Sequence, residues 1–367
     1  KGIHLIMTDT TTQAVKTDAR VVISVDAMGG DRGPGEIVAG LLLSTKQYSK
    51  IRFLIHGRED QLAPLVEKHG LQSFCTIVHA ERTVSMDEKP SQVMRHGRGT
   101  SMWSAVTSVK QFEADACVSC GNTGALMAIS MVRLRKLPGI IRPAIAILWP
   151  STNPAGSNVM LDVGADIRAD ENDLLQFALM GASYSRNGFG VTHPRVGLLN
   201  VGTEEHKGRA ELKVAHDLIR DTAGAGNFKF LGFIEGGDIP SDHVDVIVTD
   251  GFTGNIALKT AEGTASFIGN ALRNSFKHSL FSKLSAIVAY GPLSRLKQQT
   301  DPRRVNGGVF LGLNGTVVKS HGAADATGVA AAVGLAYRLG IAKFSTKLAA
   351  RVASVNGFTE DLEEDGK

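Results

Sequence analysis

The chain has 367 residues, of which 43% are hydrophobic, 21% are charged and 6% are aromatic, and its formal net charge is +4. The hydrophobic content supports a full core, and the scarcity of aromatic rings argues against a platform for single-stranded nucleic acid, so no nucleic-acid partner is expected. No apolar run reaches the roughly 18 residues that a membrane-spanning helix needs. Three cysteines are too few for a disulfide framework.

Strand-like and helix-like patterns alternate along most of the sequence. Residues 1–20 are expected to be a disordered leader or a remnant of expression cloning. A single domain is predicted over 21–345, and an acidic, frayed tail over 346–367. The predicted strands cover 21–25, 51–55, 76–79, 116–119, 144–149, 157–162 and 195–200, with two more near Phe228 and Val244. The predicted helices begin at Glu36 and after Gly124, and cover 61–69, 102–113, about 173–187 and about 209–223.

This alternation predicts an α/β fold. We expect a Rossmann-like α/β/α sandwich with a mostly parallel sheet, in which 144–149 and 157–162 form a hairpin. Residues 81–101 are polar and are predicted to be a loop.

Glycine-rich polar turns follow three of the strand-like runs. Glycine lets the backbone approach a ligand, and the first N–H groups of a helix attract anions. Ordinary capped turns between a strand and a helix are the alternative interpretation. We expect phosphate between the 121–124 and 250–255 turns, the second of which leads into a helix from Asn255. The candidate phosphate- or substrate-binding residues are Asp26, Gly29, Gly30, Gly121, Asn122, Thr123, Gly124, Asp250, Gly251, Thr253 and Gly254.

The segment 273–304 departs from the alternation and is predicted to be a protruding helical hairpin. Phe276, Leu280, Leu284 and Ile287 fall on one helical stripe, and lysines and arginines flank it. Such a stripe suits a helix that lies on an anionic membrane surface. It suits equally a hairpin that packs on the domain or on a second subunit, and the two alternatives stay open.

Two clusters suggest chemistry that we do not favour. Cys117 and Cys120 form a C-x-x-C at the end of a strand, where core packing is the preferred interpretation over redox chemistry. Asp162, Asp166 and Asp170 have the spacing of a carboxylate metal site, but Asp170 is better interpreted as a helix cap. No metal and no cofactor is predicted.

Six motifs, in order, make the chain resemble one known family. From about Val21 to about Leu339 it is similar to the bacterial acyl-acyl-carrier-protein:phosphate acyltransferases, the PlsX family. The resemblance implies a fold akin to phosphotransacetylases and isopropylmalate dehydrogenases, a homodimer, and a cytoplasmic protein in peripheral contact with the membrane. The motifs are Asp26-Ala-Met-Gly-Gly-Asp31, Gly121-Asn-Thr-Gly-Ala-Leu126, Leu161-Asp-Val-Gly-Ala165, Asn200-Val-Gly-Thr-Glu-Glu-His-Lys-Gly208, Thr249-Asp-Gly-Phe-Thr-Gly-Asn255 and Lys319-Ser-His-Gly322.

The resemblance also implies a reaction. An acyl-carrier-protein thioester and inorganic phosphate would give acyl phosphate and free acyl carrier protein, and a membrane glycerol-3-phosphate acyltransferase would consume the acyl phosphate in phospholipid synthesis. Lys207 and Asn255 match the positions regarded as catalytic. Lys207 would supply a point charge for phosphate or oxyanion, and Asn255 an amide N–H for the thioester oxygen. Taken alone, Lys207 would be a solvated loop lysine and Asn255 a helix N-cap.

Some residues depart from the family pattern, and other functions compete. Cys120, Asp166 and Trp103 stand where alanine, asparagine and a basic residue are more common, which bears on substrate preference. A phosphotransacetylase-like enzyme would use acyl-CoA instead. A dehydrogenase would need a G-x-G-x-x-G after the first strand, which this sequence lacks. A membrane scaffold would keep the hairpin without needing Lys207 or Asn255.

Overall fold

One sheet runs through the part of the chain that the computed structural model describes, which is residues 20–277, 281, 285, 289–291, 293 and 307–364, with side chains up to Ser354. Its strand order is β3-β2-β1-β4-β11-β10-β5-β6-β9-β7-β8. The strands are β1 Val21–Asp26, β2 Ile51–Gly57, β3 Cys75–His79, β4 Ala116–Ser119, β5 Ala144–Pro150, β6 Ser157–Leu161, β7 Arg195–Leu199, β8 Lys229–Ile234, β9 Val246–Val248, β10 Gly308–Leu311 and β11 Thr316–Lys319.

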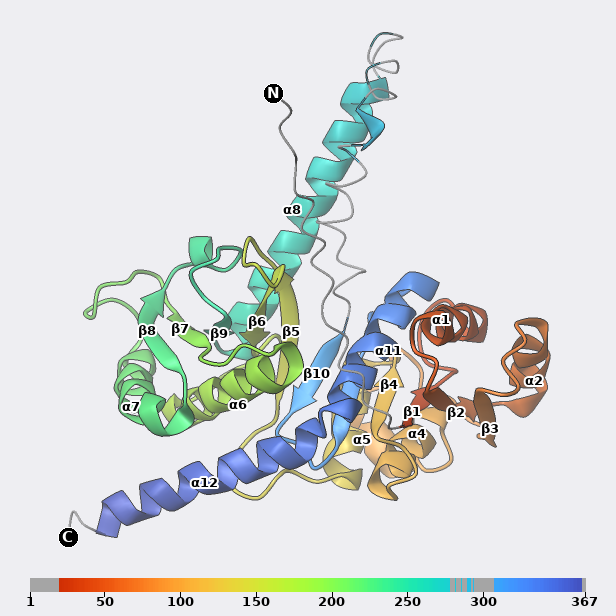
Figure 1. Ribbon diagram of the computed structural model, residues 1–367, viewed down its shortest axis with the longest axis horizontal. Helices are drawn as coiled ribbons and strands as arrows, with labels where there is room; N and C mark the ends of the chain where they lie inside the picture. The colour runs from red at the N-terminus through yellow and green to blue at the C-terminus, as the bar shows by residue number, and fades with distance from the viewer. Residues whose placement is uncertain are drawn as a thin grey trace, which may run out of the picture.

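Helices connect most of these strands and cover the sheet (Figure 1). Short apolar runs rich in valine and isoleucine form the strands, and longer segments with helical periodicity follow them. The helices are α1 Pro34–Gln47, α2 Glu59–Lys68, α3 Pro90–His96, α4 Ser101–Lys110, α5 Thr123–Arg133, α6 Glu171–Phe189, α7 Ala210–Gly226, the 3-10 turn Gly236–Asp238, α8 Gly251–Lys277, α11 Ala326–Ile341 and α12 Phe344–Glu364.

The sheet consists of two parallel halves that run in opposite directions. β1 to β4 and β11 are parallel to one another, and so are β6, β9, β7 and β8. Between the halves, β10 is antiparallel to both β11 and β5, and β5 is antiparallel to β6. The predicted mostly parallel α/β sheet and the predicted hairpin of β5 and β6 are therefore confirmed.

Two apolar layers hold the helices against the sheet, because successive side chains of a strand point to opposite faces. Val21, Ile23 and Val25 of β1 belong to the layer that contains apolar side chains of α1 and α11. Val22 packs against the second layer, which contains those of α4 and α5. In Figure 1, α8 projects from the body of the molecule.

Several elements differ from the prediction. α3 forms within the predicted loop 81–101, where Pro90 occupies the first helical turn and Val93 is buried. β10 and β11 were not predicted. The predicted tail begins inside α12, which buries Leu348 and Val352 and extends to Glu364. Each difference reflects contacts with distant parts of the chain, which override weak local signals.

The predicted hairpin falls mostly on residues for which no structure is described. Leu280, Leu284 and Ile287 lie outside the described residues, and Phe276 is half-buried near the end of α8. Among the described residues, none of the helices has both the length and the apolarity needed to cross a bilayer.

Cys117 and Cys120 are buried, and burial raises the pKa of Cys117 to about 12, as core packing requires.

A buried histidine makes the stability of the fold depend on pH. His56 is fully buried at the end of β2, and its Nδ1 lies 2.9 Å from Ser104 Oγ, while Nε2 has no partner. Burial lowers its pKa from 6.5 to about 4. Because the unfolded chain takes up the proton first as pH falls, stability is complete above pH 6.5 and is lost towards pH 4. We expect the free energy of unfolding to fall by about 3 kcal/mol over this range.

Urea denaturation at several pH values measures this loss. His56→Asn lacks the titrating group, so its free energy of unfolding should depend less steeply on pH between 6.5 and 4, whatever its stability at pH 7. If the free energy of unfolding depended on pH equally steeply in the wild type and in the variant, the pH dependence would not come from His56.

Candidate functional site

The turn after β1 is packed against the turn after β4. Asp26 is 1% exposed, and its carboxylate accepts hydrogen bonds from Ser101 Oγ at 2.6 Å and Ser119 Oγ at 2.7 Å. A Cβ added at Gly29 would lie 2.5 Å from Asp26 Oδ2 and 2.9 Å from the Gly121 nitrogen. Asp26, Gly29 and Gly121 therefore serve close packing, and their predicted contact with phosphate is not supported by this placement.

Other predicted residues of this corner are more accessible. Asn122 caps α5 by accepting from the Ala125 N–H, and its Nδ2 donates to the carbonyls of Met86 and Glu88. Thr123 and Gly124 are exposed at the start of α5, and Gly30 is half-buried with φ +101° beside Cys120. Contact of these four residues with substrate stays a prediction.

Lys319, at the end of β11, is a buried cation of the same corner that sequence reasoning did not select. Its ammonium contacts the carbonyls of Cys120, at 3.5 Å, and Ser320. Burial lowers its pKa to about 8, while the nearby carboxylates of Asp31 and Asp26 oppose the shift. The motif Lys319-Ser-His-Gly322 was the available signal, but strand β11 had not been predicted.

The turn after β9 is built differently, because the loop after β6 lies directly on the first turn of α8. A Cβ at Gly251 would overlap the carbonyl oxygen of Asp166, and one at Gly254 would overlap that of Asp162. Both glycines are buried, so they admit the neighbouring loop rather than a ligand. The helix begins at Gly251 and not at Asn255 as predicted.

Two buried carboxylates anchor this corner. Asp162, at the end of β6, accepts hydrogen bonds from the N–H groups of Ile145, Ala165 and Asp166, and burial raises its pKa to about 6 against their opposing effect. Asp250 accepts from the Thr253 N–H at 2.7 Å, and its backbone carbonyl accepts from the Gly254 N–H. These two helix N–H groups are thus already satisfied, which corrects their prediction as phosphate donors.

Arg209 is a site residue that the sequence analysis missed. It follows Lys207 and Gly208 and forms an ion pair with the buried Asp250, while its side chain stays 52% exposed. Burial raises the pKa of Asp250, but the Thr253 N–H and the Arg209 guanidinium lower it, and the net shift is downward. Asp250 therefore stays ionised and fixes Arg209 beside the first turn of α8.

Lys207 stands on the exposed loop after β7. Asn200 orders this loop through a hydrogen bond from its Nδ2 to the Lys207 carbonyl at 3.2 Å. The Lys207 ammonium lies 2.7 Å from Glu204 Oε1, which raises the pKa of the lysine and keeps it charged. Gly202 leaves room for the lysine stem, since a Cβ there would lie 2.5 Å from Lys207 Cδ.

Asn255 is exposed on the first turns of α8. Its side chain lies beside Gly164, whose added Cβ would sit 3.7 Å from Asn255 Cγ, in ordinary contact. Gly164 has φ +122°, a conformation that other residues rarely adopt. In the described part of the chain no hydrogen bond occupies the side-chain amide of Asn255, so this amide can donate to a ligand.

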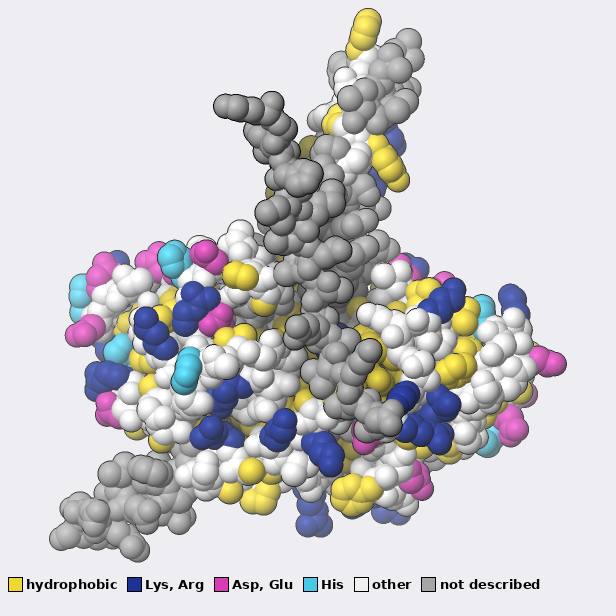
Figure 2. Space-filling view, in the orientation of Figure 1, with side chains coloured by type: hydrophobic (Ala, Val, Ile, Leu, Met, Phe, Trp, Pro, Cys, Tyr) yellow, Lys and Arg dark blue, Asp and Glu magenta, His cyan; other side chains and the backbone are white. Residues whose placement is uncertain are grey.

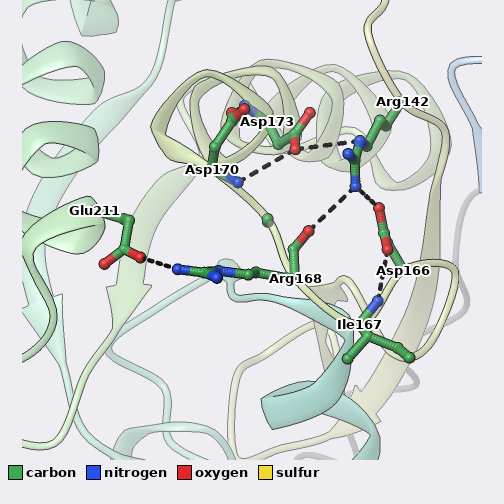
Figure 3. A pocket seen from close by; sticks show the side chains of 8 residues that line it. Arg142, Asp166, Ile167, Arg168, Asp170, Asp173 and Glu211 are labelled. Carbon is green, nitrogen blue, oxygen red and sulfur yellow. Dashed lines mark hydrogen bonds and ion pairs between the residues drawn. The ribbon is translucent and has the colours of Figure 1, made fainter.

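A cavity of about 330 Å³ adjoins this corner (Figure 3). Its two arginines are both ion-paired: Arg142 with Asp166 and Asp173, and Arg168 with Glu211 at 2.8 Å. The predicted cap of α6 is confirmed, because Asp170 accepts from the Asp173 N–H. The balanced charges of this wall stabilise the loop 162–170 and leave no spare cation for an anion.

The two corners are separate within one chain. Four strands lie between β4 and β9, and the five inter-strand spacings correspond to about 24 Å. Among the described residues, no hydrogen bond or ion pair joins 121–124 to 250–255. A single phosphate held by both turns, as predicted, is therefore not supported. The Arg209–Asp250 ion pair joins the loop that bears Lys207 to the first turn of α8, so we take the exposed residues Lys207, Arg209 and Asn255 as the candidate site.

Comparison with known proteins identifies the fold first. The structure is similar to a phosphotransacetylase from Streptococcus pyogenes, with a TM-score of 0.57 and 17% identity over 87% of this chain and 94% of that one. The chain thus has the α/β fold of the phosphotransacetylases.

The sequence then identifies the family. The chain belongs to the family described as fatty acid synthesis protein, whose model matches residues 21–347. Among its relatives are proteins named phosphate acyltransferase from Cereibacter sphaeroides, 63% identical over 97% of both chains, and from Paracoccus denitrificans, 66% identical over 91% of this chain and 90% of that one.

Proposed function

We propose that the protein is a phosphate acyltransferase that transfers the acyl group of an acyl-acyl-carrier-protein thioester to inorganic phosphate. Family membership and the names of its relatives support this reaction. The observation that supports the site is the ion pair of Arg209 with Asp250, which fixes the loop that bears Lys207 beside the first turn of α8, the helix that bears Asn255.

In this mechanism the phosphate dianion is the nucleophile and needs no strong base. Lys207 and Arg209 hold it, and phosphate displaces Glu204 from the lysine. A phosphate oxygen attacks the thioester carbonyl carbon, and Asn255 Nδ2 donates to the oxygen that becomes negative. Collapse of the tetrahedral intermediate breaks the carbon–sulfur bond. The thiolate leaves with the carrier protein and takes a proton from water, and acyl phosphate remains.

The surroundings of Asn255 suit an acyl donor. Phe252 and Ile256 flank it on α8 and are 59% and 50% exposed, so they offer apolar surface to an acyl chain. Further along α8, Phe267, Ile268 and Leu272 are also exposed. This apolar surface supports a homodimer, peripheral contact with an anionic membrane, or both, and membrane contact would bring acyl phosphate to a glycerol-3-phosphate acyltransferase.

One assay tests the function. The purified protein is incubated with acyl-acyl carrier protein and phosphate, and free thiol and acyl phosphate are measured together. Equal amounts of both products, dependent on phosphate, are expected. Thiol release without acyl phosphate would refute the proposal. A strong preference for an acyl-CoA donor over the carrier protein would favour the phosphotransacetylase alternative.

Lys207→Ala tests the phosphate-binding cation. We expect kcat/KM for phosphate to fall at least about tenfold, because the variant loses a point charge at the nucleophile. Glu204→Gln removes the competing carboxylate and should keep or improve phosphate affinity. Lys213→Ala, an exposed lysine of α7, is the control for net charge. Wild-type kinetics in the folded Lys207→Ala variant would remove this residue from the site.

A further inference from the structure

A second groove, of about 350 Å³, lies between α6 and α12. Asp173, near the start of α6, lines the first cavity, whereas Arg186 lies near the end of the helix, about 20 Å further along its axis. The groove is thus remote from the candidate site. The lining residues are Ser183, Arg186 and Asn187 of α6, and Lys347, Ala350, Arg351 and Ser354 of α12.

The spacing of these residues gives each helix one polar stripe. On α12, Lys347 and Arg351 are four residues apart and share a face, while the buried Leu348 and Val352 hold the helix on the body. Like charges at this spacing repel each other. The groove is therefore a polar seam beside an apolar helix contact.

Among the described residues, no acidic side chain balances the positive charge of the groove. It has three cations and no acidic lining residue, and none of the carboxylates described in the structure forms an ion pair with Arg186, Lys347 or Arg351. Burial and the nearby Arg351 lower the pKa of Arg186. In Figure 2, lysine and arginine side chains gather over the region where α6 and α12 lie in Figure 1. The first cavity, in contrast, pairs each of its arginines with an acid.

Both guanidinium groups are held in place. Arg186 Nη1 donates to the carbonyls of Asn227 at 2.5 Å and Gly226 at 3.1 Å, and Arg351 Nη1 donates to that of Ala225 at 3.2 Å. These bonds to the end of α7 use one nitrogen of each arginine. The remaining N–H donors of each planar fork stay available for a ligand in the groove.

We infer that this groove binds a phosphate-bearing anion, either a small phosphate ester or the headgroup of an anionic lipid. Two anchored guanidinium forks match phosphate oxygens, and Lys347 adds a mobile charge. The Ser183 hydroxyl also lines the groove, whereas the Ser354 hydroxyl donates to the Arg351 carbonyl within α12. The volume accommodates a phosphate together with part of the group that it esterifies.

Three variants of the full chain test this inference. Lys347→Gln and Arg351→Gln each remove one charge from the groove, and Lys213→Gln removes one from the exposed face of α7. Lys347 makes no anchoring bond to α7, so its variant keeps the fold. Binding is measured by calorimetry with pyrophosphate and by flotation with vesicles of phosphatidylglycerol or phosphatidylcholine. The candidate acyl-transfer site is identical in all variants, so differences in binding belong to the groove.

The outcomes separate the two sources of phosphate. At least about tenfold weaker pyrophosphate binding in both groove variants, with unchanged flotation, supports a small phosphate ester. Weaker flotation with phosphatidylglycerol only, with unchanged pyrophosphate binding, supports a lipid headgroup. Binding equal to that of Lys213→Gln in both assays would overturn the inference. Acyl transfer is expected to be unchanged in all three variants.

Discussion

Asn255→Ala should reduce kcat for acyl transfer by about 10²–10³-fold while phosphate affinity stays nearly constant. The amide donates to the thioester oxygen only as negative charge develops there, so its removal affects the transition state more than the ground state. The loss corresponds to about 3–4 kcal/mol of transition-state stabilisation. Steady-state kinetics with acyl-acyl carrier protein and phosphate measure it.

Asn270→Ala is a matched control for this variant. Asn270 is the same residue type on the same helix, is exposed, and lies several turns beyond the candidate site. It should leave kcat within about twofold of wild type. If Asn255→Ala, shown to be folded by circular dichroism, also kept the wild-type rate, Asn255 would not be the oxyanion donor.

Gly254→Ala should destabilise the protein by about 2–3 kcal/mol or more. The new methyl group would overlap the carbonyl oxygen of Asp162, which is backbone and cannot rotate away. Either α8, which carries Asn255, or the loop 162–166, which lies beside Asn255, must shift. Chemical denaturation should therefore show a lower midpoint, and acyl transfer should fall as well.

Gly263→Ala on the same helix separates this clash from a general effect of alanine. A Cβ at Gly263 meets nothing within 4 Å, so the substitution should stabilise the helix by about 0.5–1 kcal/mol. We expect the denaturation midpoint to fall in Gly254→Ala and to rise in Gly263→Ala. A Gly254→Ala midpoint at or above the wild-type value would show that the loop does not press on α8.

The sequence predicted much of the fold because its signals are local. Runs such as Val21–Val25 and Arg195–Asn200 have the composition of buried strands, and their following helices have clear periodicity. β10 and β11 were missed because two four-residue runs between glycines resemble a loop. The opposite directions of the two sheet halves depend on pairing between distant segments, such as Val309 with Ala146.

For the site, the motifs led to the right segments but to the wrong role for the glycines. Gly251 and Gly254 were assigned to a ligand, whereas they accommodate Asp166 and Asp162 from another loop. A glycine that faces protein and one that faces ligand have the same sequence pattern. Arg209 was missed for a related reason, since only its ion pair with Asp250 distinguishes it from a solvated arginine.

The place of β11 in the sheet has a consequence for how the chain acquires its structure. β11 lies between β4 and β10, and Ser119 of β4 pairs with Lys319 of β11. Lys319 also contacts the Cys120 carbonyl, 199 residues away in sequence. Until the ribosome has released this C-terminal segment, β4 is an open edge of a partial sheet, able to pair with other chains. We expect folding to be slow and to be completed only after synthesis. It should depend on keeping the unpaired edge of β4 from pairing with other chains while the protein is being made.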